Sequence, residues 1–430
     1  MGAALAALGE AKEVDPGRLV ACVHRLEAAG FVGPVYRSEA AQCLREVARR
    51  ADGLDDATCT LLEGWLEDWV APEAAPDGAN EVLRAAPTED GARASSILWD
   101  RGGIEIWPGG NYPTLDAITL GYLLRRPPDV DGWLNVLDRH LARPEDPRVW
   151  VGLVRFLDYL HLAQPERATA WLRRLFQRVP ELLRNRAGVH VVFHALEFIP
   201  PDLYAWVRQG WLTSGWAEGA QAAGEISALR FCRRVGVSGI RAELTALIEG
   251  SGIAPALVPG VRLGIAYTLV EAWPEPTLRA HVTPLLLRLI PEADEATSGA
   301  LRALFLRTDP LPADRWTDQV LRAFVSHPHV LGKGDGTFVL DRLKDVVTGG
   351  GDVKLVYEVV STLIDQAASQ LEDVRTSWAG QVGELVEIAL TLHRMPETRL
   401  EGLALFERLI VLEAYGAEEQ LASLDRRLLG

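Results

Sequence analysis

The chain has 430 residues, with 44 Lys and Arg against 59 Asp and Glu and a formal net charge of −15. This charge repels phosphate backbones and anionic lipid head groups, so we expect neither nucleic acid nor a membrane surface as a partner. A hydrophobic fraction of 48% and 13 tryptophans exclude disorder as a description of the whole chain. No window approaches the ~20 consecutive apolar residues that a membrane span needs, and we expect a soluble protein.

The first residues and the cysteines indicate the cellular compartment. Residues 1–5 lack the basic region and the long apolar run of a secretory signal, which predicts a cytoplasmic protein. The four cysteines lie in apolar helical patterns without CxxC pairing: Cys22, Cys43, Cys59 and Cys232. We therefore expect reduced, packed thiols that form neither disulfides nor a zinc site.

Four segments are expected along the chain. Residues 1–70 form an amino-terminal helical segment, and residues 71–95, rich in Pro, Ala, Asp and Gly, form a linker or long loop. Residues 96–113 form a small β-hairpin and a loop, because β-branched and aromatic residues flank a glycine turn near 96–107. Residues 114–430 form a helical repeat array.

Helical periodicity dominates this last segment. From Pro165, for example, apolar residues fall on one face, and Arg173, Arg174 and Arg178 lie largely on the other. The apolar residues of that face are Trp171, Leu172, Leu175, Phe176 and Val179. A second stripe of this kind contains Trp316, Val320, Leu321 and Phe324.

Proline followed by an acidic residue marks the expected helix starts, because proline suits the first turn and a carboxylate suits the positive end of the helix dipole. These marks are at residues 144, 165, 180, 201, 274, 291 and 396. Where they are dense they lie roughly 15 to 25 residues apart, so two helices make a unit of about 35–45 residues, the size of HEAT-like and TPR-like repeats. The sequence therefore predicts an all-α fold, an irregular α-solenoid of helical hairpins, with a compact helical bundle as the alternative.

Two patterns suggest chemistry but fit known sites poorly. His190 and His194 share a helix face with Glu197, yet Val191 stands where a zinc protease needs glutamate. The glycines and lysine of 332–337 lack the spacing and the ending of a phosphate loop. No nucleophile elbow, HExxH helix or dinucleotide fingerprint occurs, so we predict no catalysis, no metal and no cofactor, with a hidden hydrolase as a minor alternative.

Tryptophan is conspicuous in the first half of the chain, where most of it is expected in cores and between helices. Trp99 and Trp107 lie on the predicted hairpin, and Asn111 and Tyr112 lie in the loop beside it. Rigid aromatic side chains are favoured at protein interfaces. These four residues are the candidates for protein binding.

Three short patches carry a resemblance to a known family. They are 96–99 followed by 109–119, then 221–229 with Gly224 and Glu225 in its middle, and finally 405–409 followed by 414–417 and 424–427. In their order they resemble the carboxy-terminal helical region of bacterial STAND-type NTPases of anti-phage defence, the Avs-like and bacterial NLR-like proteins.

The resemblance implies a sensor. In that family this region recognises a foreign protein, and the nucleotide-binding core lies upstream. This chain has no phosphate loop, so the resemblance implies an excised domain or a separately encoded partner without ATP binding. The expected function is recognition of a protein ligand, either a phage protein or a subunit of a defence system. The alternative is a helical adaptor or regulatory subunit that a partner enzyme binds or cleaves.

Overall fold

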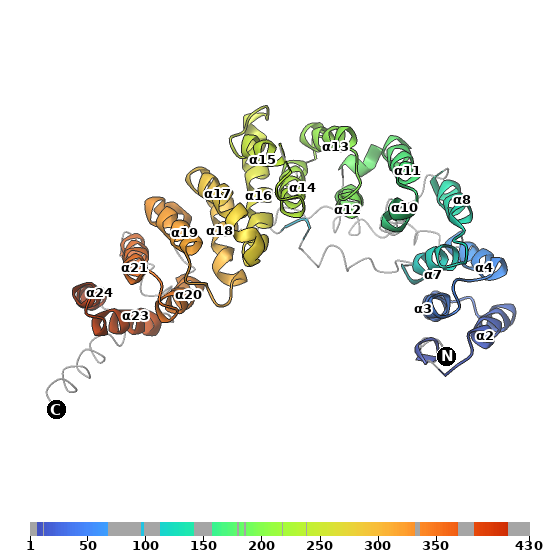
Figure 1. Cartoon of the computed structure of the whole chain (residues 1–430), viewed down its shortest axis with the longest axis horizontal. Helices are drawn as coiled ribbons and strands as arrows, with labels where there is room; N and C mark the ends of the chain where they lie inside the picture. The colour runs from blue at the N-terminus through green and yellow to red at the C-terminus, as the bar shows by residue number, and fades with distance from the viewer. Residues whose placement is uncertain are drawn as a thin grey trace. The chain divides into compact units, whose positions relative to one another are not determined.

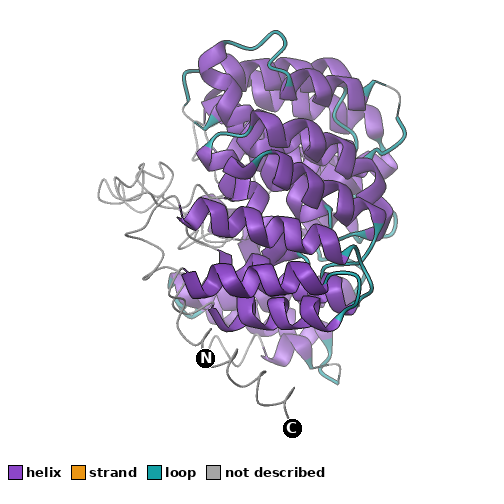
Figure 2. Cartoon of the chain, turned by 90° about the vertical axis from the view of Figure 1, so that its left-hand side faces the viewer, coloured by secondary structure: helices purple, strands orange, loops and turns teal. Residues whose placement is uncertain are grey.

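The computed structural model describes residues 7–11, 13–67, 96–98, 112–141, 157–178, 180–184, 186–216, 218–237, 239–331, 336–368 and 382–411. Every regular element in these ranges is a helix (Figures 1 and 2). The predicted all-α fold is confirmed to this extent. In these ranges no helix is long and apolar enough to cross a membrane.

The predicted hairpin is not supported. Its only described residues are 96–98, and they lie in a turn rather than in a strand. The rest of it, 99–107, lies outside the described residues, as does the predicted linker 71–95. The expected boundaries around that linker therefore stay predictions.

The described helices group into two compact units. The first contains the described residues up to Gly219 except Ser96, and the second contains Ser96 and the described residues from Ala220 on. The first unit holds α2 (Pro16–Ala28), α3 (Pro34–Arg50), α4 (Asp56–Glu67), α7 (Tyr112–Leu123), α8 (Val130–Leu141), α10 (Leu157–Ala163), α11 (Pro165–Arg178), η1 (Pro180–Arg184), α12 (Arg186–Ala195) and α13 (Pro201–Thr213). In this unit α3 and α4 both pack against α7. These contacts are long-range, because α7 begins more than sixty residues after α3 begins.

The second unit continues the helical pattern. It holds most of α14 (Gly219–Arg233), then α15 (Ile240–Ile248), η2 (Pro255–Leu257), α16 (Val258–Ala272), α17 (Pro276–Leu289), η3 (Ile290–Glu292), α18 (Glu295–Arg307), α19 (Arg315–Ser326), η4 (Pro328–Leu331), α20 (Gly336–Thr348), α21 (Val353–Ala368), α23 (Val382–Arg394) and α24 (Arg399–Val411). Figure 1 shows these helices in two rows: α15, α17, α19, α21 and α24 in one, and α16, α18, α20 and α23 in the other. Neighbours within a row are in contact.

Apolar packing stabilises this arrangement more than charge does. Phe305 and Phe324 are fully buried and lie 5.7 Å apart between ring centroids, and Trp273 and Phe406 are also fully buried. Each such side chain contributes about 1.5–3 kcal/mol. Most ion pairs between neighbours of a row are at least partly exposed, as Arg307–Glu271 at 2.6 Å and Lys344–Glu387 at 2.6 Å are, and such pairs contribute about 0–1 kcal/mol each.

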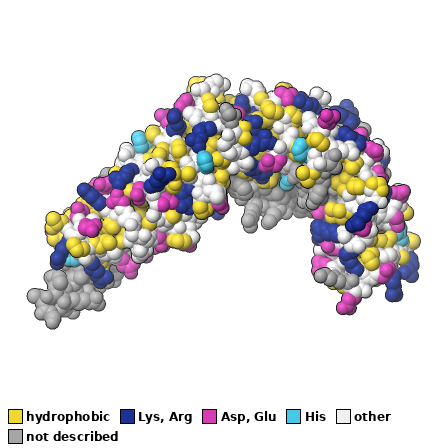
Figure 3. Space-filling model, viewed as in Figure 1, with side chains coloured by type: hydrophobic (Ala, Val, Ile, Leu, Met, Phe, Trp, Pro, Cys, Tyr) yellow, Lys and Arg dark blue, Asp and Glu magenta, His cyan; other side chains and the backbone are white. Residues whose placement is uncertain are grey.

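Basic and acidic side chains are interspersed on the face drawn in Figure 3. Pairs such as Arg322–Asp352 and Arg288–Glu249 join neighbours of a row in the second unit. Each pair contributes little to stability. The pairs therefore mainly favour the observed alignment of adjacent helices over shifted alignments.

A buried carboxylate anchors the turn at Ser96 to α14. Glu225 is fully buried, its Oε2 accepts a hydrogen bond from Ser96 Oγ at 2.9 Å, and its Oε1 accepts one from Gln221 Nε2 at 2.8 Å. Ser96 and Glu225, one residue from each of two patches that carry the family resemblance, are thus in direct contact. A buried carboxylate is stable only with such donors.

Helices α14 and α16 pack backbone against backbone in the second unit. A Cβ atom added at Gly224 would lie 2.2 Å from Val261 O, and one added at Gly264 would lie 2.1 Å from Gln221 O. Both contacts are with backbone, which cannot move aside as a side chain can. Only glycine allows the two backbones to approach this closely.

Gly264→Ala should therefore lower the free energy of unfolding of the second unit by about 1–3 kcal/mol through overpacking. The matched control is Gly299→Ala in α18, where the nearest atom to an added Cβ, Arg302 Nη2, is 3.8 Å away. That change should be neutral or stabilising by about 0.5–1 kcal/mol, because alanine favours a helix. Urea titration followed by circular dichroism measures both, and equal effects would contradict the packing of α14 on α16.

One arginine joins the end of α16 to the start of α19. Arg279 donates from Nε to Trp273 O at 3.2 Å, from Nη2 to Pro274 O at 3.0 Å, and from Nη1 to Asp314 Oδ2 at 2.7 Å. Asp314 caps α19, since its Oδ1 accepts from the backbone N–H groups of Trp316 and Thr317 at 2.9 and 3.0 Å. Burial acts to raise the pKa of Asp314, but the hydrogen bonds from Thr317 and Arg279 outweigh it and lower that pKa below 3.8.

Asp314→Ala should cost about 1–2 kcal/mol at neutral pH, because it removes a helix cap together with an ion pair. Asp314→Asn keeps a capping oxygen and isolates the loss of charge. A carboxylate with a lowered pKa stabilises the fold above its unfolded pKa of 3.8, and this is lost as the pH falls through the folded value. The difference in urea midpoint between the parent and Asp314→Asn should therefore shrink below about pH 4; a difference that stays constant with pH would show that the charge contributes nothing.

Candidate binding cleft

Helices α2, α3 and α4 of the first unit enclose an open cleft of about 770 Å³. Its lining residues come from all three helices: His24, Glu27, Arg37, Asp56, Ala57, Thr60, Leu61, Gly64 and Trp65. The lining mixes charged, small and aromatic side chains. A mostly apolar lining with a few polar groups is the usual composition of a ligand-binding site.

Local capping positions the helices that form the cleft. Asp15 Oδ1 accepts from the backbone N–H of Arg18 at 2.9 Å and caps α2, and Asp55 Oδ1 accepts from that of Thr58 at 2.7 Å at the start of α4. His24 on α2 and Thr58 on α4 share a hydrogen bond of 3.0 Å between Nε2 and Oγ1. Because Thr58 is fully buried, this bond fixes α2 against α4 at one side of the cleft.

Glu27 is the central polar residue of the cleft. Its Oε1 accepts from Arg37 Nη2 at 3.1 Å and from Trp65 Nε1 at 3.0 Å, and the Arg37 guanidinium lies 5.8 Å from the centroid of the Trp65 ring. Its Oε2 is buried and has no hydrogen-bond partner among the described residues. A buried carboxylate oxygen without a donor costs free energy, so its retention needs an explanation.

An exposed apolar shoulder adjoins the cleft. Phe31, Val32 and Val35, between α2 and α3 or at the start of α3, are 39%, 54% and 75% exposed. The ring of Phe31 lies 6.0 Å from that of Tyr36, which lies 6.4 Å from that of Trp65. Phe31 is therefore linked through the buried Tyr36 to Trp65, which lines the cleft.

Tyr36 links the shoulder to the interior. The side chain is buried, and its hydroxyl donates to Val23 O at 3.3 Å. Burial, followed by the negative charge of Glu27, raises the pKa of Tyr36 to about 12. The phenol is therefore neutral and acts as a structural donor.

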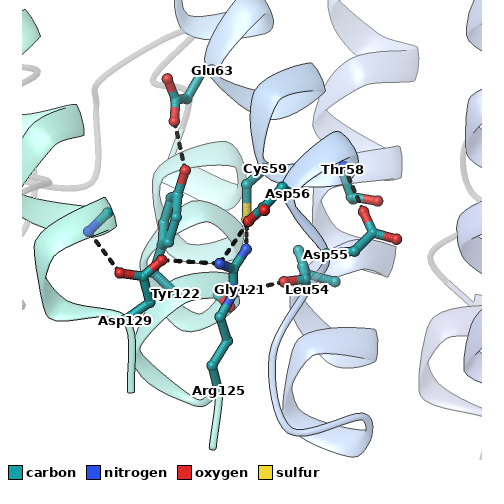
Figure 4. A network of polar contacts seen from close by, with 11 residues as sticks. Leu54, Asp55, Asp56, Thr58, Cys59, Glu63, Gly121, Tyr122, Arg125 and Asp129 are labelled. Carbon is teal, nitrogen blue, oxygen red and sulfur yellow. Dashed lines mark hydrogen bonds and ion pairs between the residues drawn. The ribbon is translucent and has the colours of Figure 1, made fainter. Parts of the chain in front are cut away.

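A polar network fixes the opposite side of α4 (Figure 4). The Arg125 guanidinium, just after α7, donates to Leu54 O at 2.9 Å, to Asp56 Oδ1 at 2.8 Å and to Asp129 Oδ2 at 3.0 Å. It also lies 4.7 Å from the centroid of the Tyr122 ring. One cation, just after α7, thus joins the turn before α4, the first residue of α4 and Asp129, the residue before α8.

Glu63 and Cys59, both on α4, complete this network. Glu63 Oε1 accepts a hydrogen bond from the Tyr122 hydroxyl at 2.9 Å, and Cys59 Sγ accepts one from Arg125 Nη2 at 3.4 Å. Burial raises the pKa of Cys59 to about 12, and burial together with the hydrogen bond to Glu63 raises the pKa of Tyr122. Cys59 and Glu63 are therefore committed to structure, whereas Asp56 belongs both to this network and to the lining of the cleft.

Gly64 leaves open space in the floor of the cleft. It lies inside α4, and a Cβ atom added there would meet nothing within 4 Å. Glycine inside a helix costs about 0.5–1 kcal/mol relative to alanine. Nothing in the packing of the described residues requires glycine here, which fits a surface that another molecule approaches closely.

The residues predicted from the sequence to bind protein remain untested. Trp99, Trp107 and Asn111 lie outside the described residues. Tyr112 is the first residue of α7, and its side chain is not among those described. The cleft was not predicted; its one sequence signal is Gly64, a glycine inside a strongly helical pattern and next to Trp65.

The described residues offer no support for metal chemistry. His190 is 6% exposed in α12, and burial, then His194, then Arg186 lower its pKa to about 4. Its imidazole is thus neutral at neutral pH. No group of three or more His, Cys, Asp or Glu side chains in the described part of the chain is placed to hold a metal ion.

The cysteines whose pKa is shifted are not activated nucleophiles. Burial raises the pKa of Cys43 to about 11 and that of Cys232 to about 12. Both are therefore thiols at neutral pH, whereas nucleophilic attack needs the thiolate. Cys43 and Cys59 are buried as expected, whereas Cys22 and Cys232 are half-buried, and none of the four forms a disulfide in the structure.

The free energy of unfolding of the first unit should fall as the pH drops below about 6.5. In this range His190 is protonated in the unfolded chain, whereas the buried side chain in the folded unit stays neutral down to about pH 4. The loss from His190 should be on the order of 2 kcal/mol between about pH 7 and about pH 5. His190→Leu removes this contribution, so its urea midpoint should rise relative to the parent as the pH falls. If the two midpoints kept a constant difference, the buried neutral state of His190 would be wrong.

Comparison with known proteins adds no relative: no family model matches the chain, and no match is found among curated proteins or among solved structures.

Proposed function

We propose that the chain is a protein-recognition module, an irregular array of helical hairpins that binds a protein ligand and performs no catalysis itself. The observation that carries this proposal is the two-row packing of the second unit, in which neighbours within each row touch. Arrays built in this way expose long continuous surfaces, and proteins use those surfaces mainly for binding. The cleft of the first unit adds a local site with a polar centre and an apolar edge.

The resemblance to STAND-type sensor regions determines the class of ligand in this proposal. On that basis the chain acts in the bacterial cytoplasm as part of an anti-phage defence system, and its ligand is a phage protein. The contact between Ser96 and Glu225 supports treating two of the resembling patches as one structural feature. Recognition of a protein is also consistent with the acidic charge of the chain, which disfavours nucleic acid.

Affinity capture with the tagged full chain, from lysates of phage-infected and uninfected bacteria, tests this function. We expect one phage protein to be enriched only after infection, as identified by mass spectrometry. Trp99→Ala and Trp107→Ala should each weaken its capture if the predicted aromatic residues form the interface. Trp206→Ala, which removes a tryptophan that is 48% exposed on α13, is the matched control.

Two outcomes would contradict the proposal. A host protein captured equally from both lysates would favour the adaptor or regulatory subunit. Enrichment of nothing above an unrelated helical protein of similar charge would remove the support for protein recognition.

A further inference from the structure

We propose that the cleft between α2, α3 and α4 binds a segment of the protein partner that presents an arginine or lysine side chain beside an apolar residue. This inference rests on the proposed function and names the site and the chemistry of the ligand. Two features carry it: the incomplete hydrogen bonding of Glu27 inside the cleft and the exposed apolar shoulder at its edge.

Some carboxylate oxygens of the cleft can still accept hydrogen bonds, whereas the basic side chains of the cleft already have partners. Glu27 Oε2 has no donor among the described residues, and Asp56 keeps 89% of its side chain exposed although Oδ1 accepts from Arg125. Arg37 is paired with Glu27 and lies over Trp65, and His24 shares a hydrogen bond with Thr58. A ligand that enters the cleft therefore finds acceptors for its donors, and a cation suits them better than an anion.

A guanidinium or ammonium group fits this site for three reasons. It provides the donor that Glu27 Oε2 lacks; because this oxygen is buried in the free chain, the carboxylate has to turn toward the cleft, which the soft final torsion of a glutamate side chain allows. It is attracted by the net charge of −15, which also accelerates encounter with a basic segment. Its aliphatic stem can pack on Ala57 and Leu61, which line the cleft, whereas the Trp65 ring is 2% exposed and already lies under Arg37.

The shoulder supplies the apolar half of the interface. Phe31, Val32 and Val35 stay exposed beside the cleft, although burial of each would stabilise the fold. Aromatic side chains such as Phe31 are enriched at the cores of protein interfaces, and the two valines extend the apolar surface that a ligand can bury. Gly64 leaves space for the backbone of the ligand segment to approach α4.

The test selects short random peptides displayed on yeast for binding to the full chain, with counter-selection against Gly64→Trp. An added Cβ at Gly64 meets open space, so this variant should fold like the parent while its indole fills the cleft. The matched control is Gly383→Trp on α23, where an added Cβ also meets nothing within 4 Å. Urea midpoints and circular dichroism of both variants check that they are folded.

The selected peptides should share an arginine or lysine next to an aromatic or aliphatic residue. Replacing that arginine with citrulline, which keeps the shape and removes the charge, should weaken binding at least about tenfold. Glu27→Gln, which keeps an acceptor for Arg37 and Trp65, should weaken it to a similar extent and remains informative if Gly64→Trp fails to fold. Gly383→Trp should leave the affinity unchanged.

Three results of the peptide experiments would overturn the inference. These are selection of no peptide, selection of peptides without a basic residue, and equal binding by the parent and Glu27→Gln. Light scattering that shows a dimer dissociated by Gly64→Trp would also overturn it, because the cleft would then be filled by a second copy of the chain.

The captured partner separates this inference from the function on which it rests. A partner that binds Gly64→Trp as well as it binds the parent would leave protein recognition intact and remove the cleft as its site. Peptide binding at the cleft without any captured partner would instead support the cleft as a binding site and remove the support for the proposed function.

Discussion

Each short helix of this chain has an apolar face that only another helix can cover, and this constraint underlies the rest of the structure. In the second unit the solution is repeated: helices two places apart pack together, so the rows α15–α17–α19–α21 and α16–α18–α20 form side by side. The two rows are also joined by apolar packing, because the fully buried ring of Phe305 on α18 lies beside that of Phe324 on α19. Surface ion pairs follow the same neighbours and are too weak to have set the arrangement.

The sequence predicted the class of fold because helical periodicity is a local property. The stripe after Pro165 is buried as expected, with Trp171, Leu172, Leu175 and Phe176 all inside. The pairs of proline and a following acidic residue predicted helix starts correctly at some positions and not at others. Pro165 and Pro201 do begin helices, whereas Pro180 begins only a 3-10 turn and Pro291 lies inside one.

Contacts between distant segments were beyond sequence reasoning. Nothing in the periodicity indicates that Arg125 joins Leu54, Asp56 and Asp129, or that Glu225 holds Ser96, because these pairings depend on how whole helices pack. The cleft escaped prediction for the same reason. Glu27, Arg37 and Trp65 lie on three helices and come together only in the folded unit.

Helix α4 is held in place on one side and carries the cleft on the other, so a rigid site can lie on a small group of helices. The side that faces α7 is held by Arg125 and Tyr122, while the other side carries Gly64 and the cleft. A site supported in this way can keep an unpaired carboxylate oxygen without local collapse, because its neighbours are fixed by contacts outside the cleft. Binding of a basic segment would then require little rearrangement of the helices.

Hydrogen–deuterium exchange of the full chain, with and without its captured protein partner, tests the location of recognition most directly. Recognition at the cleft predicts slower exchange of backbone amides in residues 24–37 and 56–65 when the partner is bound, with little change in α15 to α24. Protection confined to α15–α24, with residues 24–37 and 56–65 unchanged, would contradict the assignment of the cleft as the binding site.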